Sequence, residues 1–239
     1  MLGGVKYVRG LQSWPIPALY PQARANREHK KNIHSEDNRR PIEARSAGWA
    51  KRSAAWLAAS GISPNQISSA SAVFAAAGAA ALAWRPTPAG LVCAALGTQA
   101  RLICNLLDGM VAIEGGKKSA LGQLYNEFPD RIADSLLIVA LGYAAGLPAV
   151  GWCGALLAAL TAYVRASGGA LGFAQDFRGP MAKQHRMAVL TVACLAGAVE
   201  LAFHGTHYAL MAACVIIAAG SALTCITRTL AIAKLLRGS

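Results

Sequence analysis

Three long segments without charged residues most constrain what this chain can fold into. They cover residues 53–84, 135–164 and 201–227, and none of them contains Asp, Glu, Lys or Arg. A helix of about 20 apolar residues spans the hydrocarbon core of a bilayer. A core helix of a soluble protein would instead carry a polar stripe along one side. The sequence therefore predicts an all-α integral membrane protein.

Hydropathy and turn residues divide the chain into about six transmembrane helices. The predicted spans cover approximately residues 64–84, 88–112, 122–145, 148–165, 187–203 and 208–230. Pro64 suits the first turn of the first span, and Ser63 suits its N-cap. Gly, Ala and Ser fill most of the spans, and such small residues allow helices to pack closely in a membrane.

The segments that precede the spans are polar and basic. Residues 1–44 are rich in Pro, Arg, Lys, Asn and His, which is typical of a flexible tail. Residues 45–62 place apolar side chains, including Trp49 and Leu57, on one helical face beside basic residues. This pattern predicts an amphipathic helix that lies on the membrane surface. Residues 63–236 then form the predicted six-helix transmembrane domain.

The basic residues orient the chain in the membrane. The net charge is +12, and eleven of the 23 Lys and Arg residues precede Ser53. Most of the others fall in segments on the same predicted side, which the positive-inside rule assigns to the cytoplasm. We therefore expect a multi-pass protein of the plasma (inner) membrane with both termini in the cytoplasm. We expect no nucleic-acid partner, because no aromatic-basic motif accompanies the tail.

Polar residues gather where the second predicted span ends and the third begins. Asn105 and Asp108 are three residues apart, and Asn126 and Asp130 are four apart, so each pair shares a helical face. Polar residues inside a span are costly and usually mark a function. Oxygen ligands from two helices suit a hard cation such as Mg²⁺ or Mn²⁺. The alternative is that these residues only cap helices and bond to one another.

The spacing of these residues resembles the signature of the CDP-alcohol phosphatidyltransferase family. That signature is Asp, two residues, Asp-Gly, two residues, Ala-Arg, eight residues, Gly, three residues, Asp, three residues, Asp. This chain matches every spacing, with identical residues at Asp108, Gly109, Ala112, Gly122 and Asp130. The resemblance covers about residues 45–236 and implies the same six-helix membrane fold.

Three positions depart from the signature. Asn105 and Asn126 replace its first and third Asp, and Ile113 replaces its Arg. In the family the first three acids hold a pair of metal ions, and the last acid also acts as the base. Two amides in place of two carboxylates lower the charge offered to a metal, so the site holds one or two Mg²⁺ or Mn²⁺ ions.

The resemblance implies transfer of a phosphatidyl group, or a similar phospho-alcohol group, from a CDP-alcohol such as CDP-diacylglycerol to a hydroxyl acceptor, with release of CMP. It implies that Asp130 is the catalytic base. The implied metal ligands are Asp108, Asn105, Asn126 and Asp130. The implied contacts to the CDP moiety come from Gly109, Ala112, Gly122, Lys117 and Lys118. Family members also tend to be homodimers in the membrane.

Basic residues near the cytoplasmic ends of the later spans are expected to border the acceptor. These residues are Arg165, Arg178, Lys183, Arg186 and, next to the predicted base, Arg131. They would favour a phosphorylated alcohol, unless they serve only to orient the chain. Two further readings remain open: a catalytically impaired protein that binds lipid or nucleotide, and a transporter, whose polar sites usually lie at the midplane.

Overall fold

The computed structural model describes residues 47–84, 86–114, 116 and 122–238. The predicted tail, residues 1–44, and the loop residues Lys117 and Lys118 lie outside this part. The described residues form helices and no strand. The helices are α2 (Gly48–Ala59), α3 (Pro64–Trp84), α4 (Pro88–Glu114), α5 (Gly122–Ala144), α6 (Pro148–Ala170), α7 (Lys183–His204) and α8 (Tyr208–Arg237).

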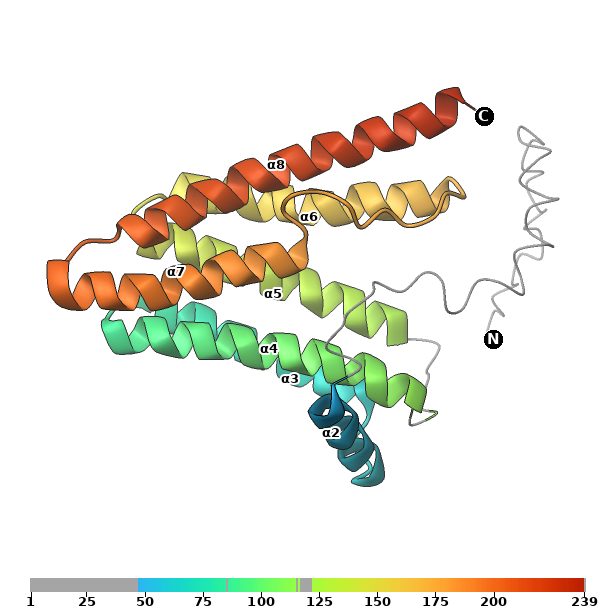
Figure 1. Cartoon of the computed structure of the whole chain (residues 1–239), viewed down its shortest axis with the longest axis horizontal. Helices are drawn as coiled ribbons and strands as arrows, with labels where there is room; N and C mark the ends of the chain where they lie inside the picture. The colour runs from blue at the N-terminus through green and yellow to red at the C-terminus, as the bar shows by residue number, and fades with distance from the viewer. Residues whose placement is uncertain (1–46, 85, 115, 117–121, 239) are drawn as a thin grey trace, which may run out of the picture. The chain divides into compact units, whose positions relative to one another are not determined.

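Helices α3 to α8 run up and down in one bundle, with α2 set across its edge (Figure 1). By length and composition, α3, α4, α6, α7 and α8 could each cross a membrane. Helix α5 carries more charges at its start, but it packs in the same bundle against α3 and α6. The fold is therefore the predicted all-α integral membrane fold.

Two hydrogen-bonded caps define helix starts. At α3, the backbone N–H of Gln66 donates to Ser63 Oγ (3.3 Å), and the N–H of Ser63 donates to Gln66 Oε1 (2.8 Å), which confirms Ser63 as the N-cap. At α8, Glu200 accepts hydrogen bonds from the backbone N–H groups of Tyr208 (2.7 Å) and Ala209 (2.8 Å). A carboxylate is favourable at a helix N-terminus, which accounts for an acid late in α7.

Glycine pairs bring neighbouring helices into backbone contact. A Cβ added at Gly142 of α5 would lie 2.6 Å from the Cα of Gly151 in α6. A Cβ added at Gly97 of α4 would lie 2.9 Å from the carbonyl oxygen of Phe74 in α3. These distances leave no room for a side chain, so the small residues of the spans allow the close packing expected of membrane helices.

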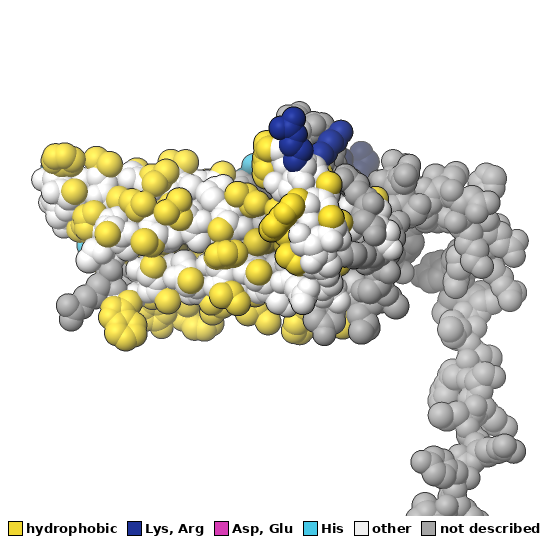
Figure 2. Space-filling view, turned by 90° about the horizontal axis from the view of Figure 1, so that it is seen from below, with side chains coloured by type: hydrophobic (Ala, Val, Ile, Leu, Met, Phe, Trp, Pro, Cys, Tyr) yellow, Lys and Arg dark blue, Asp and Glu magenta, His cyan; other side chains and the backbone are white. Residues whose placement is uncertain are grey.

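The outer surface of the bundle is apolar. Figure 2 shows hydrophobic side chains along its length, while Lys and Arg side chains gather toward one end. In α2, Ala50 and Ala54 are buried, and the helix packs against α4. Trp49 and Trp56 are exposed, so the face that α2 turns toward α4 is made of small residues and its tryptophans point away from the bundle. Its contact with a membrane surface stays a prediction.

Three helices are longer than the predicted spans. Helix α6 continues to Ala170 rather than ending near Arg165, α7 begins at Lys183 rather than Met187, and α8 continues to Arg237 rather than ending near Leu230. After α6 the chain turns at Gly172, whose φ of 88° suits glycine. A span assigned by hydropathy ends at the first charged residue, whereas the helix itself continues until the backbone conformation changes. As a result Arg165, Lys183 and Arg186 all lie on helices.

Candidate functional site

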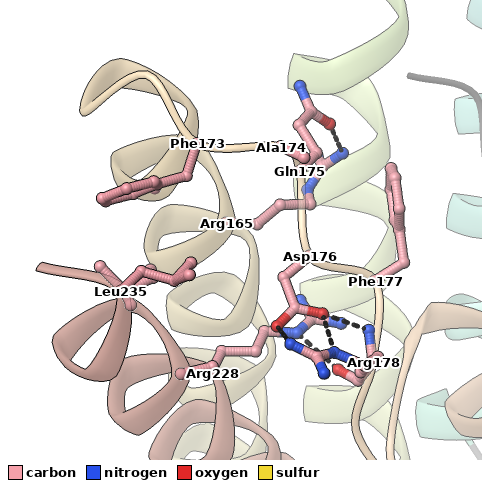
Figure 3. A pocket seen from close by; sticks show the side chains of 12 residues that line it. Arg165, Phe173, Ala174, Gln175, Asp176, Phe177, Arg178, Arg228 and Leu235 are labelled. Atoms are coloured by element: carbon pink, nitrogen blue, oxygen red, sulfur yellow. Dashed lines mark hydrogen bonds and ion pairs between the residues drawn. The ribbon is translucent and has the colours of Figure 1, made fainter. Parts of the chain in front are cut away.

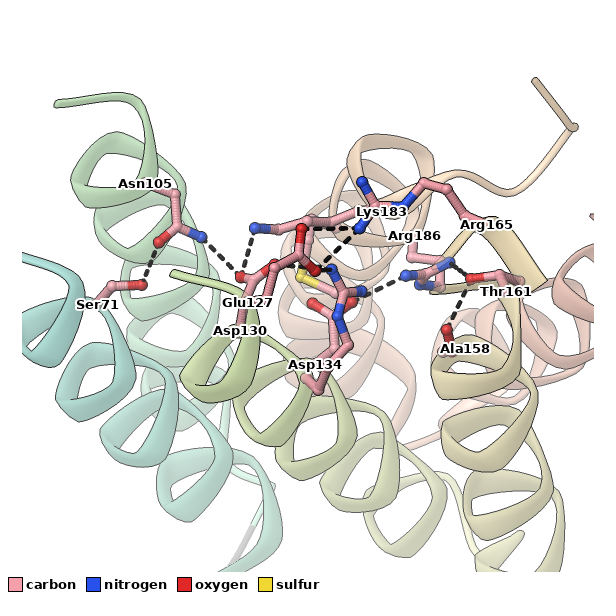
Figure 4. A network of polar contacts seen from close by, with 12 residues as sticks. Ser71, Asn105, Glu127, Asp130, Asp134, Ala158, Thr161, Arg165, Lys183 and Arg186 are labelled. Atoms are coloured by element: carbon pink, nitrogen blue, oxygen red, sulfur yellow. Dashed lines mark hydrogen bonds and ion pairs between the residues drawn. The ribbon is translucent and has the colours of Figure 1, made fainter. Parts of the chain in front are cut away.

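Asp130 of α5 belongs to a polar network that joins side chains of α3, α4, α5, α6 and α7 (Figure 4). Its Oδ1 accepts hydrogen bonds from Arg101 Nη2 (2.6 Å) and Asn105 Nδ2 (2.9 Å), both on α4. Lys183 Nζ, at the start of α7, donates to the same oxygen at 2.5 Å. The other oxygen, Oδ2, faces Arg131 Nη2 at 3.5 Å. The predicted base is therefore held firmly through one oxygen.

A second carboxylate, Asp134, lies one helical turn deeper in α5. It forms ion pairs with Arg101 (2.7 Å) and Arg186 (2.9 Å), and both guanidinium groups are essentially inaccessible, with exposures of 0% and 1%. Arg186 also donates to the carbonyl oxygen of Met181 at 2.8 Å. Buried ion pairs need such additional hydrogen bonds to offset desolvation, so this part of the network joins α4, α5 and α7.

Asp108 of α4 differs from Asp130 and Asp134 because it forms no ion pair with a cationic side chain of the described residues. Its Oδ2 accepts a hydrogen bond from Ser68 Oγ of α3 at 2.7 Å. Its Oδ1 is buried and has no hydrogen-bond partner in the described part of the chain, and the residue is only 2% exposed. A buried, half-satisfied carboxylate is costly, so Asp108 is suited to bind a positively charged group.

The backbone beside Asp108 is open. A Cβ placed on Gly109 would meet no heavy atom within 4 Å, so a bound group could approach this turn of α4 closely. Ala112 is half-buried on the same helix, and Gly122 begins α5.

Of the two amides of the motif, the structure describes the side chain of Asn105. Asn105 donates to Asp130 through Nδ2, and its Oδ1 accepts a hydrogen bond from Ser71 Oγ at 2.6 Å. Asn126 lies on α5, but its side chain is outside the described part of the structure. The structure thus brings Asn105, Asp108 and Asp130 together at the α4–α5 boundary, as the spacing predicts.

The residues fit one metal ion better than two. The described residues contain no group of three or more His, Cys, Asp or Glu side chains that could hold a metal ion. Asp108 fits a divalent cation through its free oxygen, and the Asn105 carboxamide oxygen lies one turn away. Asp130 Oδ1 does not fit as a metal ligand, because two cationic groups and an amide already donate to it.

A third group of charges links α5 to α6. Arg165 Nη2 donates to both carboxylate oxygens of Glu127 (2.8 and 2.9 Å), and Arg131 donates to the same residue at 3.0 Å. Arg165 also donates to Gln175 Oε1 and lies over the Phe177 ring, 5.2 Å from its centroid. Arg165 therefore reaches from the polar network to the loop that follows α6.

That loop and the ends of α6 and α8 line a pocket of about 610 Å³ (Figure 3). Its lining residues are Arg165, Gly168, Phe173, Ala174, Gln175, Asp176, Phe177, Arg178, Arg228, Ala231, Ile232 and Leu235. Of the five residues expected to border the acceptor, Arg165 and Arg178 line this pocket. The other three lie in the polar network around Asp130 and Asp134.

One arginine of the pocket, Arg228, was assigned to it only from the structure. Arg228 donates to the carbonyl oxygens of Arg178 (2.8 Å) and Thr161 (2.9 Å), which ties α8 to the loop. The hydrogen bonds of Arg178 lower the pKa of Asp176, so the carboxylate of this partly buried residue stays ionised at neutral pH. A lone arginine within an apolar segment, as at Arg228, was the available sequence signal.

Comparison with known sequences gives no match. No protein-family model matches this chain, and no curated protein sequence does either.

Comparison with known structures shows the fold. Mycobacterium tuberculosis phosphatidylinositol phosphate synthase (PgsA1) with CDP-DAG bound is similar at a TM-score of 0.65 and 21% identity, over 78% of this chain and 94% of that one. The same enzyme in complex with manganese and citrate gives 0.65 and 20%, over 77% and 88%. Its apo form gives 0.59 and 22%, over 75% and 93%. The chain therefore has the fold of these structures.

Proposed function

We propose that the protein is a CDP-alcohol phosphatidyltransferase of phospholipid biosynthesis. It would transfer a phosphatidyl or similar phospho-alcohol group from a CDP-alcohol such as CDP-diacylglycerol to a hydroxyl acceptor and release CMP. The observation that carries this proposal is the buried, half-satisfied carboxylate of Asp108, which lies beside the open backbone of Gly109. The fold shared with a structure that has CDP-DAG bound supports the same ligand.

A divalent cation bound at Asp108 would neutralise negative charge on the diphosphate of the donor. The manganese complex of the similar structure supports such an ion, and either Mg²⁺ or Mn²⁺ suits the oxygen ligands. Asp108 and Asn105 would hold it, together with Asn126 at its motif position. Gly109 would leave room for the diphosphate beside α4.

Asp130 would accept the proton of the acceptor hydroxyl. The hydroxyl oxygen attacks the phosphorus nearer the lipid, and the bond from that phosphorus to the CMP oxygen breaks. Arg101 and Lys183 fix the carboxylate through Oδ1, so Oδ2 is the oxygen directed to the proton. Lys183, which is 17% exposed, is also placed to face a phosphate group.

The pocket next to Arg165 would receive the acceptor. Arg165, Arg178 and Arg228 contribute three positive charges to its lining, against one carboxylate from Asp176. A phosphorylated alcohol, such as glycerol 3-phosphate or an inositol phosphate, matches this excess of charge. We further expect the site to face the cytoplasm, α2 to lie on the membrane surface, and the protein to form a homodimer in the plasma membrane.

The test uses the full chain, purified and returned to lipid with Mg²⁺ or Mn²⁺. Labelled CDP-diacylglycerol is supplied with a panel of free and phosphorylated alcohols, and released CMP is measured. We expect release that depends on one acceptor and falls at least about 100-fold in Asp130→Asn, the scale of losing general base catalysis. Glu200→Gln is the matched control, because it also replaces an acid by its amide. Glu200 lies near the end of α7 opposite to Lys183, the residue of α7 that contacts Asp130.

A catalytically impaired binding protein is the second candidate. The three donors on Asp130 Oδ1, one of which is the Asn105 amide, favour this candidate. They reduce the negative charge that is available to bind a metal ion or to accept a proton. It predicts measurable binding of CDP-diacylglycerol without CMP release for every alcohol in the panel. Absence of both binding and release would contradict both candidates.

A further inference from the structure

In the described part of the chain, each hydrogen bond that Asp130 Oδ1 accepts comes from an N–H group. Arg101, Asn105 and Lys183 approach this oxygen to 2.6, 2.9 and 2.5 Å, and they come from two helices that are distant in sequence. A metal-binding carboxylate shares its ion with other oxygen ligands. The surroundings of Asp130 Oδ1 are made of N–H groups instead, which is the environment of an ion-paired carboxylate.

The charges around Asp130 and Asp134 are already more than balanced. Arg101 lies between the two carboxylates, at 2.6 and 2.7 Å, and is completely buried. Lys183 pairs with Asp130, and Arg186 pairs with Asp134. Arg131 also lies 3.5 Å from Asp130 Oδ2, so four cationic side chains meet these two carboxylates. A divalent cation added here would be repelled by groups a few ångströms away, in surroundings that screen charge poorly.

Asn105 fits this arrangement in a way that an aspartate would not. Its amide nitrogen points to Asp130 and its oxygen to Ser71. A carboxylate in its place would put two negative groups at hydrogen-bond distance, which is unfavourable unless a cation lies between them. Compared with an aspartate, the Asn105 amide removes one negative charge, and Arg101 adds one positive charge. Both residues therefore reduce the attraction of this region for a metal ion.

We propose that Arg101 and Lys183 take the place of a divalent cation at Asp130, and that the protein binds one metal ion, at the Asp108 site, and no second ion at Asp130. Arg101 and Asn105 are then positioning residues that hold Asp130 through Oδ1. The catalytic meaning of this arrangement rests on the proposed function, but the number of bound ions can be counted without any reaction.

The first experiment counts Mn²⁺ bound to the full chain in lipid nanodiscs, with free Mn²⁺ followed by electron paramagnetic resonance. We expect one ion per protomer, lost in Asp108→Asn and retained in Asp130→Asn. Two ions in the unaltered protein, none at all, or loss of the ion in Asp130→Asn would each overturn the proposal. Absence of CMP release would leave these counts untouched, so failure of the proposed function is recognised separately.

The second experiment tries to create the missing metal site. Asn105→Asp with Asn126→Asp should still bind one ion while Arg101 is present, and the further change Arg101→Leu should raise the count to two. Arg101→Lys in its place should keep the count at one. Thermal unfolding of each variant shows that it is folded. A second ion already present with Arg101 intact, or no second ion in a folded triple variant, would contradict the role assigned to Arg101.

Discussion

At the scale of single residues, Gly109 is a position where a substitution should weaken ligand binding without destabilising the fold. An added methyl group there meets no heavy atom of the described structure within 4 Å, but it occupies the space beside Asp108. We expect Gly109→Ala to weaken CDP-diacylglycerol binding by about tenfold, which corresponds to about 1.4 kcal/mol. The melting temperature should not fall, because alanine favours a helix over glycine by roughly 0.5–1 kcal/mol.

Gly169→Ala is the matched control for this prediction. It makes the same change within helix α6, where the nearest heavy atom to the new Cβ would be the Gln175 Cγ at 4.0 Å. Binding of CDP-diacylglycerol, measured by calorimetry in detergent, should be unchanged in this variant. Equal binding by Gly109→Ala and the unaltered protein would show that the donor does not approach α4 at this turn.

The residues of the site could be predicted from sequence to different extents. The spacing of Asn105, Asp108 and Asp130 placed them together, because residues three and four apart share a helical face. Arg101 was visible only as a polar residue near the end of its span, since its partner Asp130 is 29 positions later. Contacts between distant helices leave no local pattern, so the ion pairs and the pocket required the structure.

At the scale of helices, the glycine contact between α5 and α6 limits which substitutions the bundle accepts. A Cβ on Gly142 would lie 2.6 Å from Gly151 Cα and 3.1 Å from the Leu147 carbonyl oxygen. Both neighbours are backbone, so the helices must separate. We expect Gly142→Ala to reduce the free energy of unfolding by about 1–3 kcal/mol, the usual cost of overpacking. Thermal unfolding in detergent measures the change, with Gly169→Ala as control, and equal stability of the two variants would contradict this packing.

Helix positions were predicted better than helix ends. The starts of α3, α4 and α6 coincide with Pro64, Pro88 and Pro148, because proline is tolerated in the first turn. The ends of α6 and α8 extend past charged residues at Arg165 and Arg228, which hydropathy takes as the end of a span. Long basic side chains allow a helix to continue beyond the apolar region.

At the scale of the whole molecule, α5 decides the topology. Only five of the described helices meet the length and composition of a membrane span, but α5 packs between α3 and α6 along the bundle. If α5 crosses, the six helices place both chain ends on one side. We expect alkaline phosphatase, which is active only outside the cytoplasm, to be inactive when fused after Ser239 in a bacterial host and active when inserted at Gly205.

Controls for the fusions are a cytoplasmic reporter at the same two positions, which should give the opposite pattern. If α5 did not cross, five spans would put the two chain ends on opposite sides. Activity of alkaline phosphatase after Ser239, together with a cytoplasmic N-terminus, would therefore show that α5 does not span the membrane.

The ion pairs of α5 have a consequence for how the chain is made. Asp130 and Asp134 leave the ribosome well before Lys183 and Arg186, which lie 53 and 52 residues further along. At the usual speed of synthesis this is a delay of roughly 3–10 seconds. During that interval Arg101 and Arg131 are the cationic partners already made, and Asp134 still lacks Arg186. Helix α5 should therefore settle into the bilayer only after α7 has emerged, and a ribosome stalled before α7 should leave α5 accessible from the cytoplasm.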